Sequence, residues 1–92
     1  MNKLTTLLLA SLTSLLVTTP AQAQWAMTCT REYNSSVNLR NQPSTRATVI
    51  ASIPNESYVR ALTWVWGADK MRWWKTEYNG LVGWMRSDYL CR

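Results

Sequence analysis

The chain has 92 residues, with ten Lys and Arg, five Asp and Glu and no His, which gives a net charge of +5 at pH 7. The absence of His excludes the Ser-His-Asp and Cys-His catalytic mechanisms. The five carboxylates are scattered, so the sequence predicts no pair for glycoside hydrolysis, and it contains no glycine-rich phosphate-binding loop. We therefore expect a protein without enzymatic activity and without a cofactor.

Residues 1–23 have the pattern of a cleaved signal peptide. Lys3 gives a positive start, residues 4–17 form an apolar run interrupted by Thr and Ser, and Ala21 and Ala23 match the small residues before a cleavage site. A transmembrane helix is the alternative, but such a helix needs roughly 20 apolar residues. No cysteine follows the cleavage site to carry a lipid. We expect a periplasmic or secreted protein without a membrane anchor after processing.

Removal of residues 1–23 leaves 69 residues, which is one domain with a modest core. The two cysteines are Cys29, in a lead-in segment over residues 24–36, and Cys91. Because disulfides persist in oxidising compartments, we expect the two thiols to pair and to stabilise the fold by roughly 4 kcal/mol. Free buried thiols are the alternative. Two thiolates without any His cannot complete a tetrahedral shell, so no metal site is expected.

After the lead-in, short β-rich runs alternate with turns, which is typical of an all-β sandwich or barrel. The expected strands cover residues 37–40, 49–53, 58–66, 71–78 and 81–87. Residues 54–57 form a turn in which Asn55 can adopt a left-handed conformation. Asn79 and Gly80 predict a type I′ hairpin turn, which needs a positive φ at both positions. Residues 87–90 form a short turn or 3-10 segment. We expect about five strands in a small closed barrel, because closure leaves few exposed edges.

Strand alternation predicts which side chains point into the core. The inward set is Val37, Leu39, Val49, Ala51, Ile53, Val59, Ala61, Thr63 and Val65. The opposite face of the long strand holds Tyr58, Arg60, Leu62, Trp64 and Trp66, pointing outward or under a loop. Trp73 and Trp74 are adjacent, so at least one of them leaves the core.

Three motifs occur in an order and with gaps that resemble the bacterial-type SH3 domain. The first is Val37-Asn38-Leu39-Arg40-Asn41-Gln42-Pro43-Ser44-Thr45, and the second is Val49-Ile50-Ala51-Ser52-Ile53. The third consists of Trp73, Lys75, Asn79, Gly80, Gly83, Trp84, Met85, Tyr89 and Leu90. Gln42 replaces the usual Gly of the first motif. The resemblance implies an SH3-like barrel over residues 37–92 that recognises peptidoglycan, especially its peptide stems or bridges.

The same resemblance implies a groove lined by the first loop and by aromatic strands. Six Trp and four Tyr, without any Phe, make aromatic residues the candidates for stacking and cation–π contacts with peptides or sugars. The candidate ligand-binding residues are Asn41, Ser44, Tyr58, Trp64, Trp66, Trp73 and Trp84. Lys75 or Arg86 could meet a carboxylate. The alternative is that the tryptophans fill a second small core beneath the loops.

The sequence thus predicts a monomeric, non-enzymatic exported module that binds peptidoglycan or cell-wall peptide. The alternative function is a protein-interaction or inhibitory module that docks on an envelope protein. Binding to single-stranded nucleic acid is disfavoured, because export removes the chain from nucleic acid and its positive charges are interspersed with negative ones.

Overall fold

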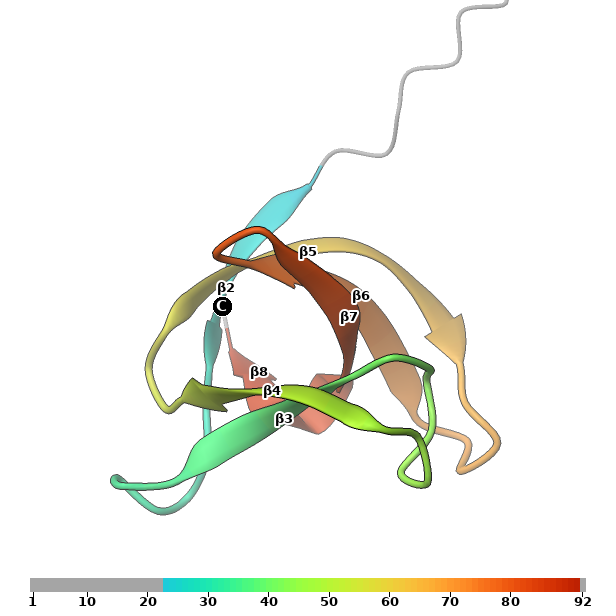
Figure 1. Cartoon of the computed structure of the whole chain (residues 1–92), viewed down its shortest axis with the longest axis horizontal. Helices are drawn as coiled ribbons and strands as arrows, with labels where there is room; N and C mark the ends of the chain where they lie inside the picture. The colour runs from blue at the N-terminus through green and yellow to red at the C-terminus, as the bar shows by residue number, and fades with distance from the viewer. Residues whose placement is uncertain (1–22, 92) are drawn as a thin grey trace, which may run out of the picture.

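The computed structural model describes residues 23–91, and within this range the chain forms seven strands and one 3-10 helix (Figure 1). The elements are β2 Gln24–Thr28, β3 Ser36–Arg40, β4 Val49–Pro54, β5 Tyr58–Trp66, β6 Arg72–Tyr78, β7 Leu81–Arg86, the 3-10 helix η2 Ser87–Tyr89 and β8 Leu90–Cys91. Apart from Ala23, the expected signal peptide lies outside the described residues. Among residues 23–91 there is no helix with the length and apolar character needed to cross a membrane.

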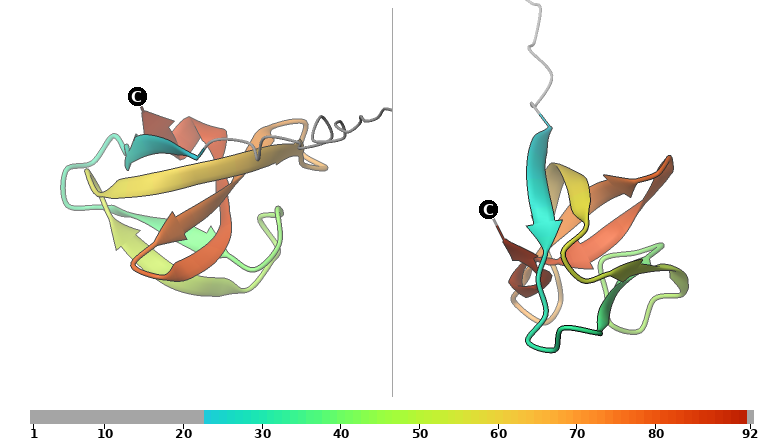
Figure 2. Two further views of the ribbon diagram at one scale, coloured as in Figure 1. Left: turned by 90° about the horizontal axis from the view of Figure 1, so that it is seen from above. Right: turned by 90° about the vertical axis from the view of Figure 1, so that its left-hand side faces the viewer.

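The strands form one antiparallel sheet in the order β4-β3-β7-β6-β5-β2-β8. The sheet curls on itself, so that β3 and β4 face β5 across the interior (Figures 1 and 2). The expected all-β, SH3-like architecture is confirmed, with two strands more than predicted. The lead-in segment contributes β2, and the residues after the 3-10 helix contribute β8.

The prediction of a closed barrel is wrong, because the edge strands β4 and β8 do not pair with each other. β8 has only two residues, and β4 ends at Pro54, which has no N–H to donate to a ladder. The buried Thr28 of β2 bridges the gap instead. Its hydroxyl donates to the Pro54 carbonyl at 2.8 Å and accepts the Ser57 N–H at 2.8 Å.

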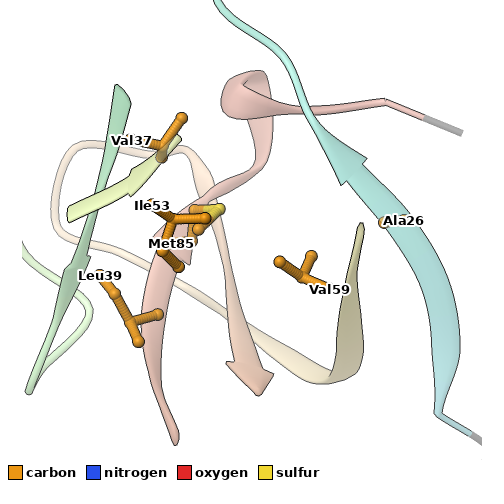
Figure 3. Packing of buried hydrophobic residues seen from close by; sticks show 6 residues of the cluster. All are labelled: Ala26, Val37, Leu39, Ile53, Val59 and Met85. Carbon is orange, nitrogen blue, oxygen red and sulfur yellow. The ribbon is translucent and has the colours of Figure 1, made fainter. Parts of the chain in front are cut away.

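The core lies inside the curl of the sheet (Figure 3) and consists of Ala26, Val37, Leu39, Ile53, Val59 and Met85. Alternation correctly placed the β3 and β5 members, and Ile53 of β4, in this core. Val49 was expected inward but is 43 % exposed. The reason is a shift in pairing: Leu39 faces Ala51, whereas Arg40 faces Val49, which leaves Ile50 as an extra residue in β4. Val49 therefore shares the outer face with Arg40.

A second bulge reverses the faces of the distal half of β5. The pairs on either side of it are Ala61 with Thr76 and Thr63 with Lys75. Leu62 is therefore the extra residue, and beyond it Trp64 and Trp66 lie on the same face as the core. The predicted faces of Thr63 and Val65 and of the two tryptophans are thus wrong.

Local turn chemistry agrees with the sequence at the β6–β7 hairpin. Asn79 and Gly80 have φ values of 49° and 84°, as a type I′ turn requires. In the turn after β4, Glu56 rather than Asn55 has the positive φ, at 63°. The Asn55 side chain instead accepts the backbone N–H of Thr30 at 2.9 Å, which attaches this turn to the lead-in segment.

The disulfide between Cys29 and Cys91 is formed, with a Cα–Cα distance of 5.8 Å. It joins the end of β2 to the end of β8, next to the pairs that these two strands make. The backbone N–H of Cys29 also donates to the carbonyl of Tyr89 at 2.8 Å. The disulfide therefore links the two ends of the described domain beside the open edge of the sheet.

Candidate functional site

A groove opens on the outer face of β3, β7 and β6, on the other side of the sheet from the core. Its floor is formed by Trp73 and Arg86, which are opposite each other in the β6–β7 pair. One wall is β3 with the β3–β4 loop, and the other is the β5–β6 turn with η2. The groove consists of two cavities of about 210 and 350 Å³ that share Thr45. Its polar lining includes Ser36, Asn38, Arg40, Ser44 and Asp69.

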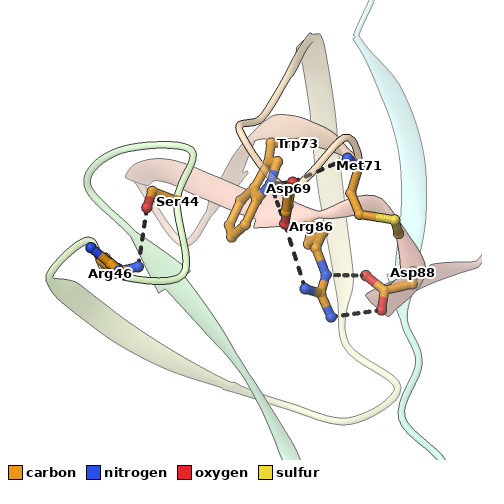
Figure 4. Close-up of polar contacts among 7 residues, drawn as sticks. All are labelled: Ser44, Arg46, Asp69, Met71, Trp73, Arg86 and Asp88. Carbon is orange, nitrogen blue, oxygen red and sulfur yellow. Dashed lines mark hydrogen bonds and ion pairs between the residues drawn. The ribbon is translucent and has the colours of Figure 1, made fainter.

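A polar network fixes the floor of the groove (Figure 4). The Asp69 carboxylate accepts the indole Nε1–H of Trp73 at 3.1 Å and the backbone N–H of Met71 at 3.1 Å. The same carboxylate lies 3.6 Å from the guanidinium of Arg86, which also donates to both carboxylate oxygens of Asp88, at 2.7 and 3.0 Å. Trp73 is only 2 % exposed. The network orients Trp73 and Arg86 before any ligand arrives.

The charges of this network are stabilised by their partners. Loss of hydration raises the pKa of Asp69, but the hydrogen bonds from Trp73, Met71 and Arg86 outweigh it and leave the pKa below its ordinary value of 3.8. The hydrogen bonds to Asp88 raise the pKa of Arg86. Arg86 is therefore a structural cation with two carboxylate neighbours, and it is not the free cation that the sequence suggested for a ligand carboxylate.

Replacing Asp69 with Asn is expected to flatten the acid dependence of stability. Since the pKa of Asp69 is lower in the folded than in the unfolded chain, its ionised form stabilises the fold above the ordinary pKa. That contribution disappears as the pH falls through the lowered folded-state pKa. Between about pH 5 and about pH 2, the melting temperature of the wild type should fall more steeply than that of Asp69→Asn. Circular dichroism melts at several pH values measure this difference. The control variant Glu32→Gln, at an exposed position, should have the same pH dependence of the melting temperature as the wild type. Parallel curves for the wild type and Asp69→Asn contradict the prediction.

Two further cations lie in a row across the outer face. Arg40 pairs with Trp84 between β3 and β7, and Trp84 pairs with Lys75 between β7 and β6. Arg40 donates to the carbonyl of Ala47 at 2.9 Å, which holds it beside the β3–β4 loop. Within residues 23–91 neither Arg40 nor Lys75 forms an ion pair. Both cations are therefore available to an anionic ligand at this face.

Gly83 sets the close approach of β3 to β7 that builds this row. A Cβ at Gly83 would lie 2.7 Å from the carbonyl oxygen of Arg40 and 2.7 Å from Cγ of Leu39. No other residue fits this space without moving the backbone of β3. The glycine of the third sequence motif thus positions Arg40 against Trp84.

The structure distributes the predicted ligand-binding residues over four places. Those at the groove or in the adjoining row are Ser44, Trp73 and Trp84. Asn41 is exposed at the base of the β3–β4 loop, where its N–H donates to the carbonyl of Thr48. Tyr58 lies on the outer face of β5, opposite Met27 of β2. Trp64 and Trp66 lie at the far end of β5 on the core face.

Most of the groove lining was not among the predicted site residues, including Arg40, Thr45, Asp69 and Tyr89. Arg40 could have been found, because alternation with the inward Leu39 places it on the outer face. The guanidinium of Arg86 lies 5.4 Å from the ring centroid of Tyr89, a contact made possible by η2. No sequence pattern indicates that Asp69, in a turn, reaches Trp73 and Arg86.

A family model described as the bacterial SH3 domain matches residues 35–90, which is more than half of the chain. The chain belongs to the bacterial SH3 domain family. Members of this family are binding modules, often for cell-wall or protein partners, and are generally non-catalytic. No curated protein and no solved structure matches the chain significantly.

The matched region of this SH3 domain contains the groove floor and the row formed by Arg40, Trp84 and Lys75. β2, with Trp25, precedes the matched region. In the part of the domain that the structure describes, no three His, Cys, Asp or Glu side chains gather as a metal site would require.

Proposed function

We propose that this SH3 domain is an exported, non-enzymatic module that binds the acidic peptide part of the bacterial cell wall on the outer face of β3, β7 and β6. The observation that carries the proposal is the row in which Arg40 and Lys75 flank Trp84 without ion-pair partners among the described residues. Family membership supports a cell-wall or protein ligand. The disulfide supports a periplasmic or extracellular location, since such bonds persist in oxidising compartments.

The groove suits an extended peptide. Hydroxyl and amide groups of Ser36, Asn38 and Thr45 line it and can pair with the N–H and C=O groups of a peptide backbone. The planar guanidinium of Arg40 can donate two parallel hydrogen bonds to a carboxylate, and Lys75 adds a second positive charge. Because a single exposed ion pair contributes about 0–1 kcal/mol, binding requires these contacts to act together.

Cosedimentation with purified cell-wall sacculi tests the proposal. Changing Arg40 and Lys75 together to Gln is expected to reduce retention by about tenfold, because two charge-assisted contacts are lost. The matched control changes Arg31 and Arg60 to Gln. It removes the same amount of charge from residues that line neither the groove nor the row. Equal retention of the two double variants, or no retention of the wild type, contradicts the proposal.

Docking on an envelope protein is a second candidate function, favoured by a separate apolar surface. A cavity of about 340 Å³ on the outer side of β2 and β5 is lined by Trp25, Ala26, Met27, Tyr58 and Cys91. Trp25 and Tyr58 are both more than half exposed. Co-purification of one stoichiometric envelope protein, lost on Trp25→Ala and kept by the Arg40 and Lys75 variant, supports this function. The absence of such a protein contradicts it.

A further inference from the structure

The hairpin formed by the end of β5 and the start of β6 presents two tryptophans on the face that continues from the core. Trp64 is opposite Trp74, and Trp66 is opposite Arg72. The rings of Trp64 and Trp66 are nearly perpendicular, at 88°, with centroids 5.2 Å apart. Trp64 is 37 % and Trp66 is 66 % exposed. The pair therefore leaves one indole, that of Trp66, largely open to solvent.

A cation is held beside this pair. The guanidinium carbon of Arg72 lies 5.2 Å from the ring centroid of Trp64, a cation–π contact that fixes the position of the charge. Arg72 has no ion-pair partner among residues 23–91. A cavity of about 180 Å³ borders Arg72 and is also lined by Trp74 and Ser87. An unneutralised cation thus lies between an aromatic platform and a small cavity.

We propose that these residues form a binding site for a sugar that carries a carboxylate. The apolar C–H face of a pyranose ring can pack on the flat indole of Trp66. Its carboxylate can accept hydrogen bonds from Arg72, with the bidentate geometry that a guanidinium favours. Its hydroxyl groups can pair with the hydroxyl of Ser87 at the edge of the cavity. Trp66, Arg72 and Ser87 thus contact the ring face, the carboxylate and the hydroxyl groups of such a sugar, respectively.

This site is separate from the groove of the proposed function. Trp73 and Trp74 are adjacent in β6 and point to opposite faces of the sheet, Trp73 into the groove floor and Trp74 beside the cavity. The sheet itself lies between the two sites. A failure of either proposal therefore leaves the other unaffected.

The narrowness of the platform favours a sugar over a protein partner. A stable protein interface buries about 800 Å² on each partner. Here Val65, between the two tryptophans, pairs with Trp73 on the opposite face, and the strand ends at Trp66. The two tryptophans at this end of β5 suit packing against one or two rings of an oligosaccharide.

Titration of the purified protein with trigalacturonic acid tests the site, with the tryptophan indole N–H signals followed by NMR. Signals of Trp64 and Trp66 should move, and that of Trp25, on the outer face of β2, should not. The Trp66→Ala variant should bind at least about fivefold more weakly, which is the lower end of the loss seen when a stacking ring is removed. Arg72→Gln should lower the affinity to that of the neutral trisaccharide maltotriose. Arg31→Gln, at an exposed position of the lead-in segment, is the matched charge control and should leave the affinity unchanged.

Several outcomes overturn the proposal. Absence of any shift does so, and so does equal affinity for maltotriose and trigalacturonic acid in the wild type. Tighter binding of triglutamate or of a thymidine trinucleotide at the same signals assigns the surface to a peptide or to nucleic acid instead. Circular dichroism melts check that Trp66→Ala is folded, which the exposure of this side chain leads us to expect.

Discussion

Replacing Cys29 and Cys91 together with Ser is expected to lower the free energy of unfolding by about 4 kcal/mol. The two residues are 62 positions apart, so the disulfide restricts nearly the whole described chain in its unfolded state. A domain of this size has a total stability of about 3–10 kcal/mol. The variant should therefore be marginally folded at 25 °C, as measured by urea denaturation followed by tryptophan fluorescence.

The control for this experiment is reduction of the disulfide. Dithiothreitol should destabilise the wild type by a similar amount and should leave the double Ser variant unchanged. If the double variant unfolds at the same urea concentration as the oxidised wild type, the disulfide is not needed to hold the ends of the open sheet together.

Replacing Leu39 with Ala is expected to cost about 3 kcal/mol. Leu39 is fully buried at the centre of the core, and truncation of a buried Leu loses apolar burial and leaves a cavity. Val49→Ala is the matched control in the neighbouring strand, because Val49 is 43 % exposed on the outer face. It should cost less than about 1 kcal/mol. Urea denaturation of both variants gives the comparison.

The same pair of variants tests the bulge in β4. Strict alternation along this strand places Val49 inward, whereas the shifted pairing at Leu39 and Arg40 places it outward. If Val49→Ala lowers the free energy of unfolding as much as Leu39→Ala does, Val49 points into the core. In that case β4 pairs with β3 without a bulge at Ile50. The register of β4 on β3 would then differ from the one described.

The sequence predicted the parts of the fold that depend on local chemistry. Alternation found Val37, Leu39, Ile53 and Val59 because these stretches run without interruption against their neighbours. Asn79 and Gly80 define their hairpin by backbone preference alone. The disulfide was predicted from the presence of two cysteines and from the oxidising compartment expected for an exported chain.

The errors arise where pairing between strands overrides alternation. The extra residues Ile50 and Leu62 shift the register against a partner strand, and neither carries a sequence signal such as Gly that marks a bulge. The predicted barrel does not close, because β8 is short and β4 ends in a proline, so the two edge strands cannot form hydrogen bonds with each other. These features depend on the arrangement of whole strands.

The candidate site was predictable in its residue types and not in its assembly. The sequence offered aromatic and basic side chains as candidates, but their grouping in space depends on the order β3-β7-β6. That order brings Arg40 beside Trp84 and Lys75, which follow it by more than 30 positions. It leaves Tyr58 on a different surface, although the sequence had grouped it with the groove residues.

The most direct test of the proposed binding face is a titration of the isotope-labelled protein with a soluble peptide from the cell wall, followed by backbone and indole chemical shifts. Our account predicts shifts in β3, in residues 41–48 and 68–73, at Lys75, and from Trp84 to Tyr89. Shifts confined to the surface around Trp25 and Tyr58 would contradict it.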